Sequence, residues 1–364
     1  MKKDQNSPLA SVVEPLLAWY EQHRRALPWR DFPTPYHVWL SEIMLQQTRI
    51  EAVIPYYERF LSVYPTVSAL AEADDEQLMK LWEGLGYYSR ARNLKKAAIE
   101  IVNNHGGNLP ASYEALRTLP GIGAYTAGAI ASIAFGLPEP AVDGNVLRVV
   151  TRLVADERDI MRETTKRAVT ASLRAVYPTK PPEAAAMTQA LMELGERVCI
   201  PSGKPHCDMC PLGASCLARQ RDLTDRIPVR SPKKPRRIEQ KTVFLLLCGD
   251  RVALVKRPDT GLLAGLWEFP SADAYTDATT AAAHLTECGT SLTLLTRGVD
   301  ATHIFTHIEW HMQSYVAVCN REITQWNGRA LTYATLRELT EQYAVPTAYR
   351  AFVRALAEFL SPLP

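Results

Sequence analysis

The sequence predicts two domains of different fold class, an all-α domain over residues 8–217 and an α+β domain over residues 240–362. Apolar residues recur at three-to-four spacing through the first part, which is typical of amphipathic helices. Alternating and β-branched runs take over in the second part. Between them, residues 217–241 hold nine Lys or Arg against three Asp or Glu, with three prolines. This composition predicts a basic linker over residues 218–239.

The individual elements follow from the same periodicities. The expected helices of the first domain include residues 36–47, 111–119, 126–136 and 143–154, separated by the turn signals Gly106-Gly107, Pro120-Gly121 and Pro138. In the second domain, strands are expected at residues 241–248 and 251–258, joined by a Gly249-Asp250 turn, and at 302–312 and 313–320. Residues 277–289 and 346–360 read as helices.

Charge and hydropathy narrow the function classes only slightly. The formal net charge of +2 is too small for bulk charge to indicate a nucleic-acid partner. The apolar run 243–248 is too short to cross a bilayer, and Glu14 and Pro15 interrupt the N-terminal apolar stretch that a signal peptide needs. We therefore expect a cytoplasmic protein that does not bind membranes.

A glycine-bearing turn joins two expected helices at Leu119-Pro120-Gly121-Ile122-Gly123. Gly121 and Gly123 allow a tight turn whose backbone can approach another molecule closely. The N-terminus of the helix that follows carries unpaired N–H groups, which suit a DNA phosphate. An ordinary connection between two helices has the same appearance, so the turn by itself leaves both interpretations open.

Four of the seven cysteines fall within eighteen residues, at Cys199, Cys207, Cys210 and Cys216. Four thiolates so close together can enclose one metal centre. The spacing alone does not separate zinc from an iron–sulfur cluster. The other three cysteines are scattered and are expected to be small apolar residues, at positions 248, 288 and 319.

Asp143 directly precedes a strongly amphipathic segment, and on its own it would be a helix N-cap. The hairpin followed by this aspartate resembles the helix-hairpin-helix family of DNA glycosylases. The resemblance implies that Asp143 is the essential carboxylate beside the sugar of a flipped nucleotide, kept ionised by the helix dipole, and that Asn145 supports it. It also implies that the four cysteines hold a 4Fe-4S cluster, although the first gap between them is one residue longer than is usual in the family.

The segment PYHVWLSEIMLQQT resembles the adenine DNA glycosylase (MutY) branch of that family. It supplies Glu42, which the resemblance implies is the general acid that protonates adenine. Its apolar neighbours are expected to raise its pKa, whereas a lone helical glutamate is usually just solvated. The bifunctional endonuclease III branch has a nucleophilic lysine just after the hairpin, and this chain has Tyr125 there. Without that amine, efficient lyase chemistry is not expected.

Further positions match the same branch. Residues that the resemblance places in the duplex or against 8-oxoguanine are Gln47, Thr48, Leu85 and Tyr87. Residues that match the pocket for the flipped adenine are Trp29, Arg30, Gln189 and Met192. For Trp29 and Tyr87, a place in an ordinary aromatic core is the competing interpretation.

The segment 254–270, LVKRPDTGLLAGLWEFP, resembles the front of a Nudix hydrolase fold. The expected helix after it lacks the carboxylates that would hold catalytic magnesium, so a phosphohydrolase is not expected. The resemblance implies instead a Nudix-like recognition domain whose Phe305-Thr306-His307 segment reaches 8-oxoguanine, with Thr306 where the family usually has serine. A zinc site at His303, His307 and His311 is disfavoured, because the surroundings are β-type rather than helical.

The combined interpretation is a monofunctional DNA glycosylase that releases adenine mispaired with 8-oxoguanine or guanine. Its expected partner is duplex DNA carrying that mispair, and we expect a monomer associated with the nucleoid. Two alternatives remain: a bifunctional glycosylase/lyase of the endonuclease III type, and a DNA-damage binding protein without catalysis. Release of adenine without trapping of a Schiff base separates the first interpretation from both.

Overall fold

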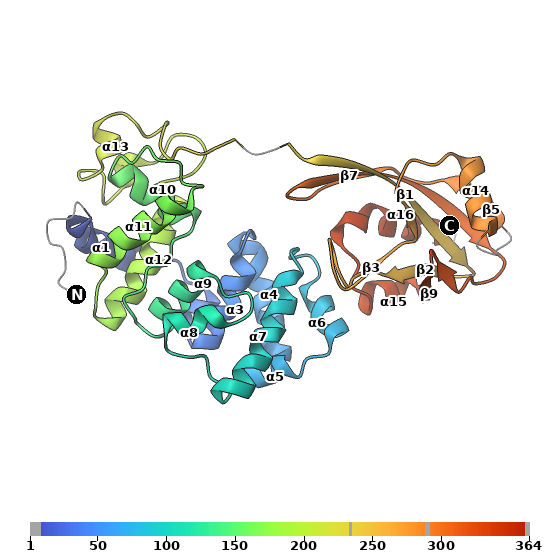
Figure 1. Ribbon diagram of the computed structural model, residues 1–364, viewed down its shortest axis with the longest axis horizontal. Coiled ribbons are helices and arrows are strands. Elements are labelled where there is room, and N and C mark those ends of the chain that lie inside the picture. Colours follow the sequence, from blue (N-terminus) through green and yellow to red (C-terminus); the bar gives the residue numbers. More distant parts are fainter. Residues whose placement is uncertain (1–8, 233–234, 288–291, 361–364) are drawn as a thin grey trace. The chain divides into compact units, whose positions relative to one another are not determined.

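A computed structural model describes residues 9–232, 235–287 and 292–360. The chain forms two compact units, residues 1–72 with 92–232, and residues 73–91 with 233–364 (Figure 1). Parts of the predicted ranges lie outside the described residues, namely residue 8, residues 233–234, residues 288–291 with Cys288, and residues 361–362.

The first unit consists of helices. Their bounds are 3-10 helix Ala10–Val12, α1 Val13–His23, α2 Pro28–Asp31, α3 Pro35–Leu45, α4 Ile50–Val63, α5 Val67–Ala71, α7 Ser89–His105, α8 Tyr113–Thr118, α9 Ala124–Ala129, α10 Gly144–Leu153, α11 Glu163–Val176, α12 Pro181–Arg197 and α13 Leu217–Gln220. A π-helical turn (Ile130–Ala134) continues α9, and a 3-10 turn (Cys207–Met209) lies among the cysteines. The first three residues of α7 group with the second unit.

Local chemistry explains where these helices begin and end. Thr34 caps α3 by accepting a hydrogen bond from His37 N, and Pro35 occupies the first helical position. Asp143 caps α10 through Val146 N. Helix α7 ends before Gly106 and Gly107, which both have positive φ. The predicted helices at 36–47, 111–119, 126–136 and 143–154 are therefore present, with each end displaced by one or two residues.

An apolar cluster holds α1, α10, α11 and α12 together. Leu16, Val146, Val150 and Leu191 are all at most 2% exposed within it. The side chains Cys199, Cys210 and Cys216 pack against the same cluster. The loop that carries the cysteines is thus fixed on the helices that carry Asp143.

The second unit is a sheet with helices on both faces. Its elements are α6 Asp75–Trp82, β1 Arg237–Cys248, β2 Arg251–Lys256, β3 Trp267–Glu268, β4 Ser271–Ala272, α14 Ala278–Glu287, β5 Leu292–Arg297, β6 Ala301–Ile304, β7 Ile308–Cys319, β8 Gln325–Trp326, β9 Arg329–Thr335, α15 Leu336–Glu341, 3-10 helix Thr347–Tyr349 and α16 Arg350–Leu360. The strand order is β5-β7-β1-β2-β9-β8, with β1 and β7 parallel.

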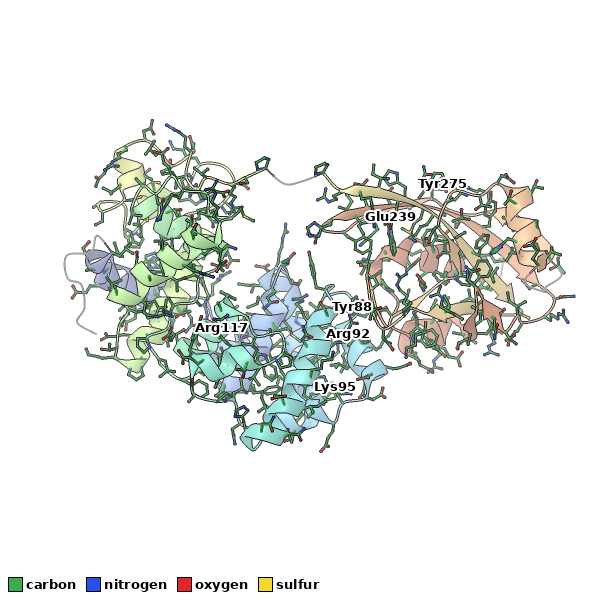
Figure 2. The ribbon with its side chains drawn as sticks, viewed as in Figure 1. Tyr88, Arg92, Lys95, Arg117, Glu239 and Tyr275 are labelled. Atoms are coloured by element: carbon green, nitrogen blue, oxygen red, sulfur yellow. The ribbon has the colours of Figure 1, made fainter. Side chains whose placement is uncertain are left out.

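Strand β1 is apolar on both sides because the sheet is covered on both sides. Val243 and Leu245 pack in one cluster with residues of α16, such as Phe352. Phe244 packs in a second cluster with Leu285 of α14. This alternation accounts for the continuous apolar run of residues 243–248. On the next strand across, Trp310 Nε1 donates to Glu239 Oε2 at 2.8 Å, and Glu239 is labelled in Figure 2.

The structure differs from the expected elements at two places. The predicted strand 302–312 is broken at Phe305–His307, where a turn separates β6 from β7, and β7 then runs without interruption through residues 313–319. Residues 73–91, expected within the helical domain, group with the second unit, where Lys80 Nζ donates to Tyr343 O and Val345 N donates to a Glu83 oxygen. Contacts across such sequence distances leave no local periodic signal.

Most of the predicted linker is held on the helical unit. Arg152 Nε donates to Ile227 O at 2.7 Å, and Ile160 N donates to Val229 O at 3.0 Å. Ile227 itself is 1% exposed. The predicted domain boundaries stay a prediction. Among the described residues, no helix has the length and apolar character needed to cross a membrane.

Candidate functional site

The helical unit contains a cavity of about 370 Å³. This size is within the usual range for small-molecule sites. The cavity gathers predicted residues from five separate segments of the chain. Ten of them line it: Trp29, Arg30, Glu42, Gln47, Thr48, Tyr125, Asp143, Asn145, Gln189 and Met192.

Glu42 of α3 is a buried acid in the cavity wall, 6% exposed. Tyr125 OH, from α9, donates to Glu42 Oε2 at 2.6 Å. Burial raises the pKa of Glu42 to about 7, with the nearby Asp143 adding to the rise and the Tyr125 hydrogen bond and Arg30 opposing it. Glu42 is therefore placed to hold a proton near neutral pH and release it to a bound group.

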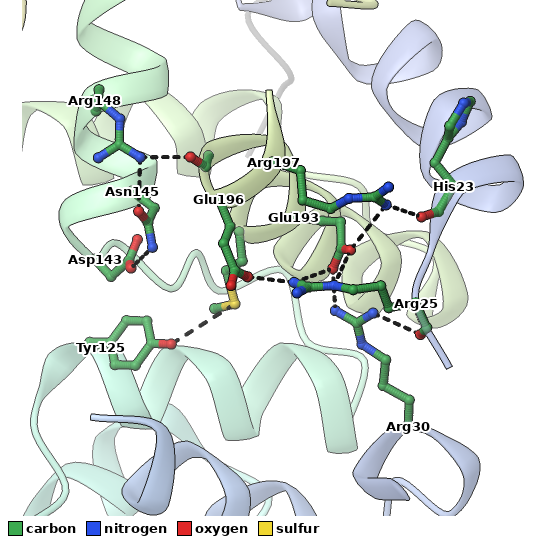
Figure 3. Close-up of polar contacts among 12 residues, drawn as sticks. His23, Arg25, Arg30, Tyr125, Asp143, Asn145, Arg148, Glu193, Glu196 and Arg197 are labelled. Carbon is green, nitrogen blue, oxygen red and sulfur yellow. Dashed lines mark hydrogen bonds and ion pairs between the residues drawn. The ribbon is translucent and has the colours of Figure 1, made fainter. Parts of the chain in front are cut away.

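Asp143 has hydrogen-bond donors on both carboxylate oxygens. Val146 N donates to Oδ1 at 2.8 Å. Asn145 Nδ2 donates to Oδ2 at 2.9 Å (Figure 3). Burial still raises the pKa of Asp143 above its usual value, although these hydrogen bonds lower it. The expectation from the helix dipole alone therefore left out the larger opposing effect, which is loss of water around the carboxylate.

Asn145 is itself held by a buried arginine. Arg148, 2% exposed, donates from Nη2 to Asn145 Oδ1 at 2.9 Å and to Gly195 O at 2.7 Å. Its Nε donates to Cys199 O at 2.7 Å. The amide that supports Asp143 is therefore held by Arg148, as Figure 3 shows, and Arg148 is in turn fixed by α12 and by the start of the cysteine loop.

Gly195 lets α12 approach α10 closely enough for these contacts. A Cβ atom at Gly195 would lie 2.7 Å from Asn145 Cβ. We expect Gly195→Ala to displace Asn145, since overpacking a dense contact costs about 1–3 kcal/mol. The displacement is expected to slow the single-turnover rate at this site roughly tenfold, which corresponds to about 1.4 kcal/mol of lost transition-state stabilisation. Glu183→Ala, in the first turn of the same helix, is the control. Unchanged rates in both variants would show that this close contact is unimportant.

The cavity also contains charged residues that the sequence did not single out. Glu193 of α12 has a side chain with no solvent exposure, and it pairs with Arg25 and Arg30. The sequence pattern could have indicated Glu193, because it lies three residues after Ala190 and next to Leu194, inside the apolar stripe of the helix. A charge in such a stripe indicates a buried ion pair.

The predicted hairpin is present between α8 and α9. Gly121 has φ +75, and a Cβ atom there would lie 2.7 Å from Asn93 Cβ, so both backbone and space require glycine. Gly123 has ordinary φ and open space around it. It directly precedes α9, so the first N–H groups of that helix lie at the hairpin.

The remaining residues predicted to contact DNA belong to the second unit. Thr306 and His307 are exposed at the turn between β6 and β7. The ring of Phe305 packs edge-to-face against that of Trp310, with 4.9 Å between the ring centroids. Tyr87 has φ +47, is 46% exposed, and its OH lies 3.0 Å from Thr306 Oγ1. Leu85 is only 6% exposed. The structure therefore joins Tyr87 to the predicted recognition turn.

The four clustered cysteines line one small cavity of the helical unit. All four are half-buried free thiols. No three Cys, His, Asp or Glu side chains in the described part of the chain lie close enough together to hold a single metal ion. The thiols therefore surround a shared space without converging on one point. Arg152 Nη1 donates to Cys199 Sγ at 3.2 Å.

Comparison with protein families assigns both units. Residues 40–176 match the model described as HhH-GPD superfamily base excision DNA repair protein. Residues 242–355 match the model of the NUDIX domain. Together with the helical unit and the sheet covered by helices, these matches confirm the predicted fold class.

Individual proteins are similar over most of the chain. The adenine DNA glycosylase of Homo sapiens is 38% identical over 315 residues, which cover 70% of this chain and 56% of that protein. That of Buchnera aphidicola subsp. Baizongia pistaciae is 36% identical over 260 residues, covering 70% and 72%. A solved thermostable thymine-DNA glycosylase is 26% identical with a TM-score of 0.54, covering 60% of this chain and 99% of that one. The chain thus spans little more than half the length of its human relative.

Proposed function

Since this chain belongs to the adenine DNA glycosylase family, we propose that it hydrolyses the N-glycosidic bond of adenine mispaired with 8-oxoguanine or guanine in duplex DNA. The observation that carries the proposal is the pair of buried carboxylates in one cavity: Glu42 with its raised pKa, and Asp143 with donors on both oxygens. We also propose that the protein acts as a monomer in the cytoplasm, in association with the nucleoid.

Each carboxylate has a distinct part in the proposed reaction. The Glu42 proton passes to N7 of adenine, so that the base leaves as a neutral molecule when the bond to the sugar breaks. Asp143 in its ionised form stabilises the sugar cation or forms a transient bond with it. Water then adds to the sugar cation, or displaces Asp143 from the sugar, and its proton passes to the Glu42 carboxylate, which restores the acid. Tyr125 and Asn145 assist by orienting Glu42 and Asp143.

The residues around the cavity support simple hydrolysis without strand cleavage by a lyase step. Tyr125 occupies the position of the lyase lysine, and its OH is engaged by Glu42. No lysine is among the described residues that line the cavity. A Schiff base with the sugar needs such an amine.

DNA recognition is proposed for the residues around the two turns. Gly121 and Gly123 place the hairpin backbone and the start of α9 against a phosphate. Trp29, Arg30, Gln189 and Met192 enclose the flipped adenine. The residues proposed to enter the duplex or contact 8-oxoguanine are Gln47, Thr48, Leu85, Tyr87, Phe305, Thr306 and His307. The hydroxyl of Thr306 can serve this contact, as serine would.

A 4Fe-4S cluster fits the cysteine site better than one zinc ion does. A single tetrahedral ion requires its ligands to converge on one point, whereas a cubane occupies the space between them. Cys199, Cys207, Cys210 and Cys216 surround a shared cavity in the latter manner. These four thiolates would hold the cluster, which would tie the loop to α10 and α12 and supply no step of the hydrolysis.

Loss of one cysteine tests this assignment. We expect Cys210→Ser to lose bound iron and sulfide and to lower Tm by on the order of 10 °C. The variant loses several kcal/mol of ligation free energy, and each kcal/mol of stability corresponds to about 2–4 °C of Tm in a domain of this size. Iron analysis and thermal unfolding measure both effects. Cys248→Ser, a half-buried cysteine on β1, is the matched control. Full iron content in Cys210→Ser would contradict the ligand assignment.

The function itself is tested by single-turnover assays on duplexes with adenine opposite 8-oxoguanine, guanine or thymine. We expect release of adenine, fastest opposite 8-oxoguanine, and only weak trapping by borohydride. Trapping as efficient as that of a bifunctional enzyme would favour the lyase. Tight lesion binding with no release of adenine would overturn the proposed activity.

A further inference from the structure

Three arginines surround the buried carboxylate of Glu193 (Figure 3). Arg25 Nε lies 2.5 Å from Oε1, and Arg30 Nη2 lies 2.9 Å from Oε2. Arg197 Nη1 lies 3.5 Å from Oε1, and Arg25 also pairs with Glu196. Glu193 is therefore the shared partner that joins the loop before α2, α2 itself and α12.

The Glu193 carboxyl is held in its ionised form in this position. Burial by itself raises the pKa of its carboxyl, but the hydrogen bonds from Arg25 and Arg30 outweigh burial and hold the pKa below its usual value. Arg30 is only 15% exposed on its side chain, so water offers it little alternative solvation. Its other anchor is a neutral group, the Arg25 carbonyl, at 3.0 Å. Removing the Glu193 charge would leave Arg30 without a compensating anion.

Arg30 lies in the same cavity wall as Glu42, where its positive charge favours the ionised form of that acid. The buried Asp143 has the opposite effect, and Tyr125 donates a hydrogen bond to Glu42. The titratable and charged groups that line this cavity with Glu42, from all the elements around it, are Arg25, Arg30, Arg49, Tyr125, Asp143, Glu193 and Glu196.

We propose that Glu193 is a positioning residue that holds Arg25 and Arg30 in the cavity wall and neutralises them, so that Glu42 keeps its proton until it acts on the base. The inference rests on the proposed function, because it concerns the acid of that reaction. The two guanidinium groups then present hydrogen-bond donors to a purine without acting as uncompensated cations beside Glu42. Glu193 acts through these arginines.

The test compares two variants that remove opposite charges from the same ion pair. Glu193→Gln keeps the shape but leaves Arg30 uncompensated, so we expect the high-pH limb of the single-turnover rate to move down by about one pH unit. Arg30→Gln removes the cation, so the limb is expected to move up. Loss of stability alone would not produce shifts of opposite sign. Glu183→Gln, at the exposed start of α12, is the control and is expected to leave the limb in place.

A second readout does not depend on catalysis. Carbon-13 NMR of glutamate-labelled protein follows the Glu42 carboxyl directly, with its signal assigned by loss in Glu42→Gln. We expect its titration midpoint to move in the same directions as the rate. Glu193→Asp keeps the charge and is expected to restore the midpoint, even where its shorter side chain lowers the rate.

The outcomes distinguish failure of the proposed activity from failure of the role assigned to Glu193. A wild-type protein that releases no adenine would refute the proposed function, while the NMR titration would still decide the role of Glu193. Unshifted midpoints in both Glu193→Gln and Arg30→Gln would overturn the inference. If Glu193→Gln does not fold, Arg30→Gln decides alone: an upward shift supports the inference, and an unshifted midpoint overturns it.

Discussion

Glu42→Gln is expected to slow single-turnover release of adenine by about 10²–10⁴-fold, the usual contribution of a positioned general acid. Glutamine keeps the shape and still accepts the hydrogen bond from Tyr125 OH. What it lacks is a proton that can be transferred to the base. Binding to a mispaired duplex is therefore expected to stay near the wild-type level, measured by fluorescence anisotropy. Glu51→Gln, an exposed glutamate in the first turn of α4, is the control.

The wild-type rate should carry the signature of the same acid. Burial raises the pKa of Glu42 to about 7, so the protonated form prevails below pH 7 and is lost as pH rises through that value. Adenine release is thus expected to fall about tenfold for each pH unit well above 7. A rate that stays constant from pH 6 to pH 9 would exclude Glu42 as the general acid.

Asp143→Asn is expected to reduce the rate by about 10³-fold or more, because a neutral amide cannot stabilise the positive charge that develops on the sugar. The fold should survive, since asparagine caps helices as well as aspartate does and keeps an acceptor for Val146 N. Thermal unfolding checks the fold, and single-turnover assays check the rate.

Asp74 offers a matched comparison. It also caps a helix, α6, by accepting a hydrogen bond from the N–H three residues later, and it does not line the cavity. Asp74→Asn should therefore have a wild-type rate. If Asp143→Asn were equally active, the role of Asp143 would be limited to capping α10.

Local sequence patterns were sufficient to predict several features of the structure. Apolar spacing placed the helices of the first unit, and Gly249-Asp250 placed the turn between β1 and β2. The position of Asp143 before an amphipathic run indicated the N-cap that the structure contains. Cysteine spacing indicated one shared centre, although not which metal. Each of these features depends on residues close together in sequence, where periodicity and capping chemistry are decisive.

Only the tertiary structure decided how those features combine. Glu42 meets Tyr125, and Arg25 meets Glu193, across separations of 83 and 168 residues. The raised pKa of Asp143 depends on burial by distant helices, which outweighs its local hydrogen bonds. The sequence by itself thus predicted which carboxylate and cysteine side chains carry chemistry. Their protonation and the arginine pairing around Glu193 depend on long-range packing, because desolvation and charge compensation are properties of the assembled cavity.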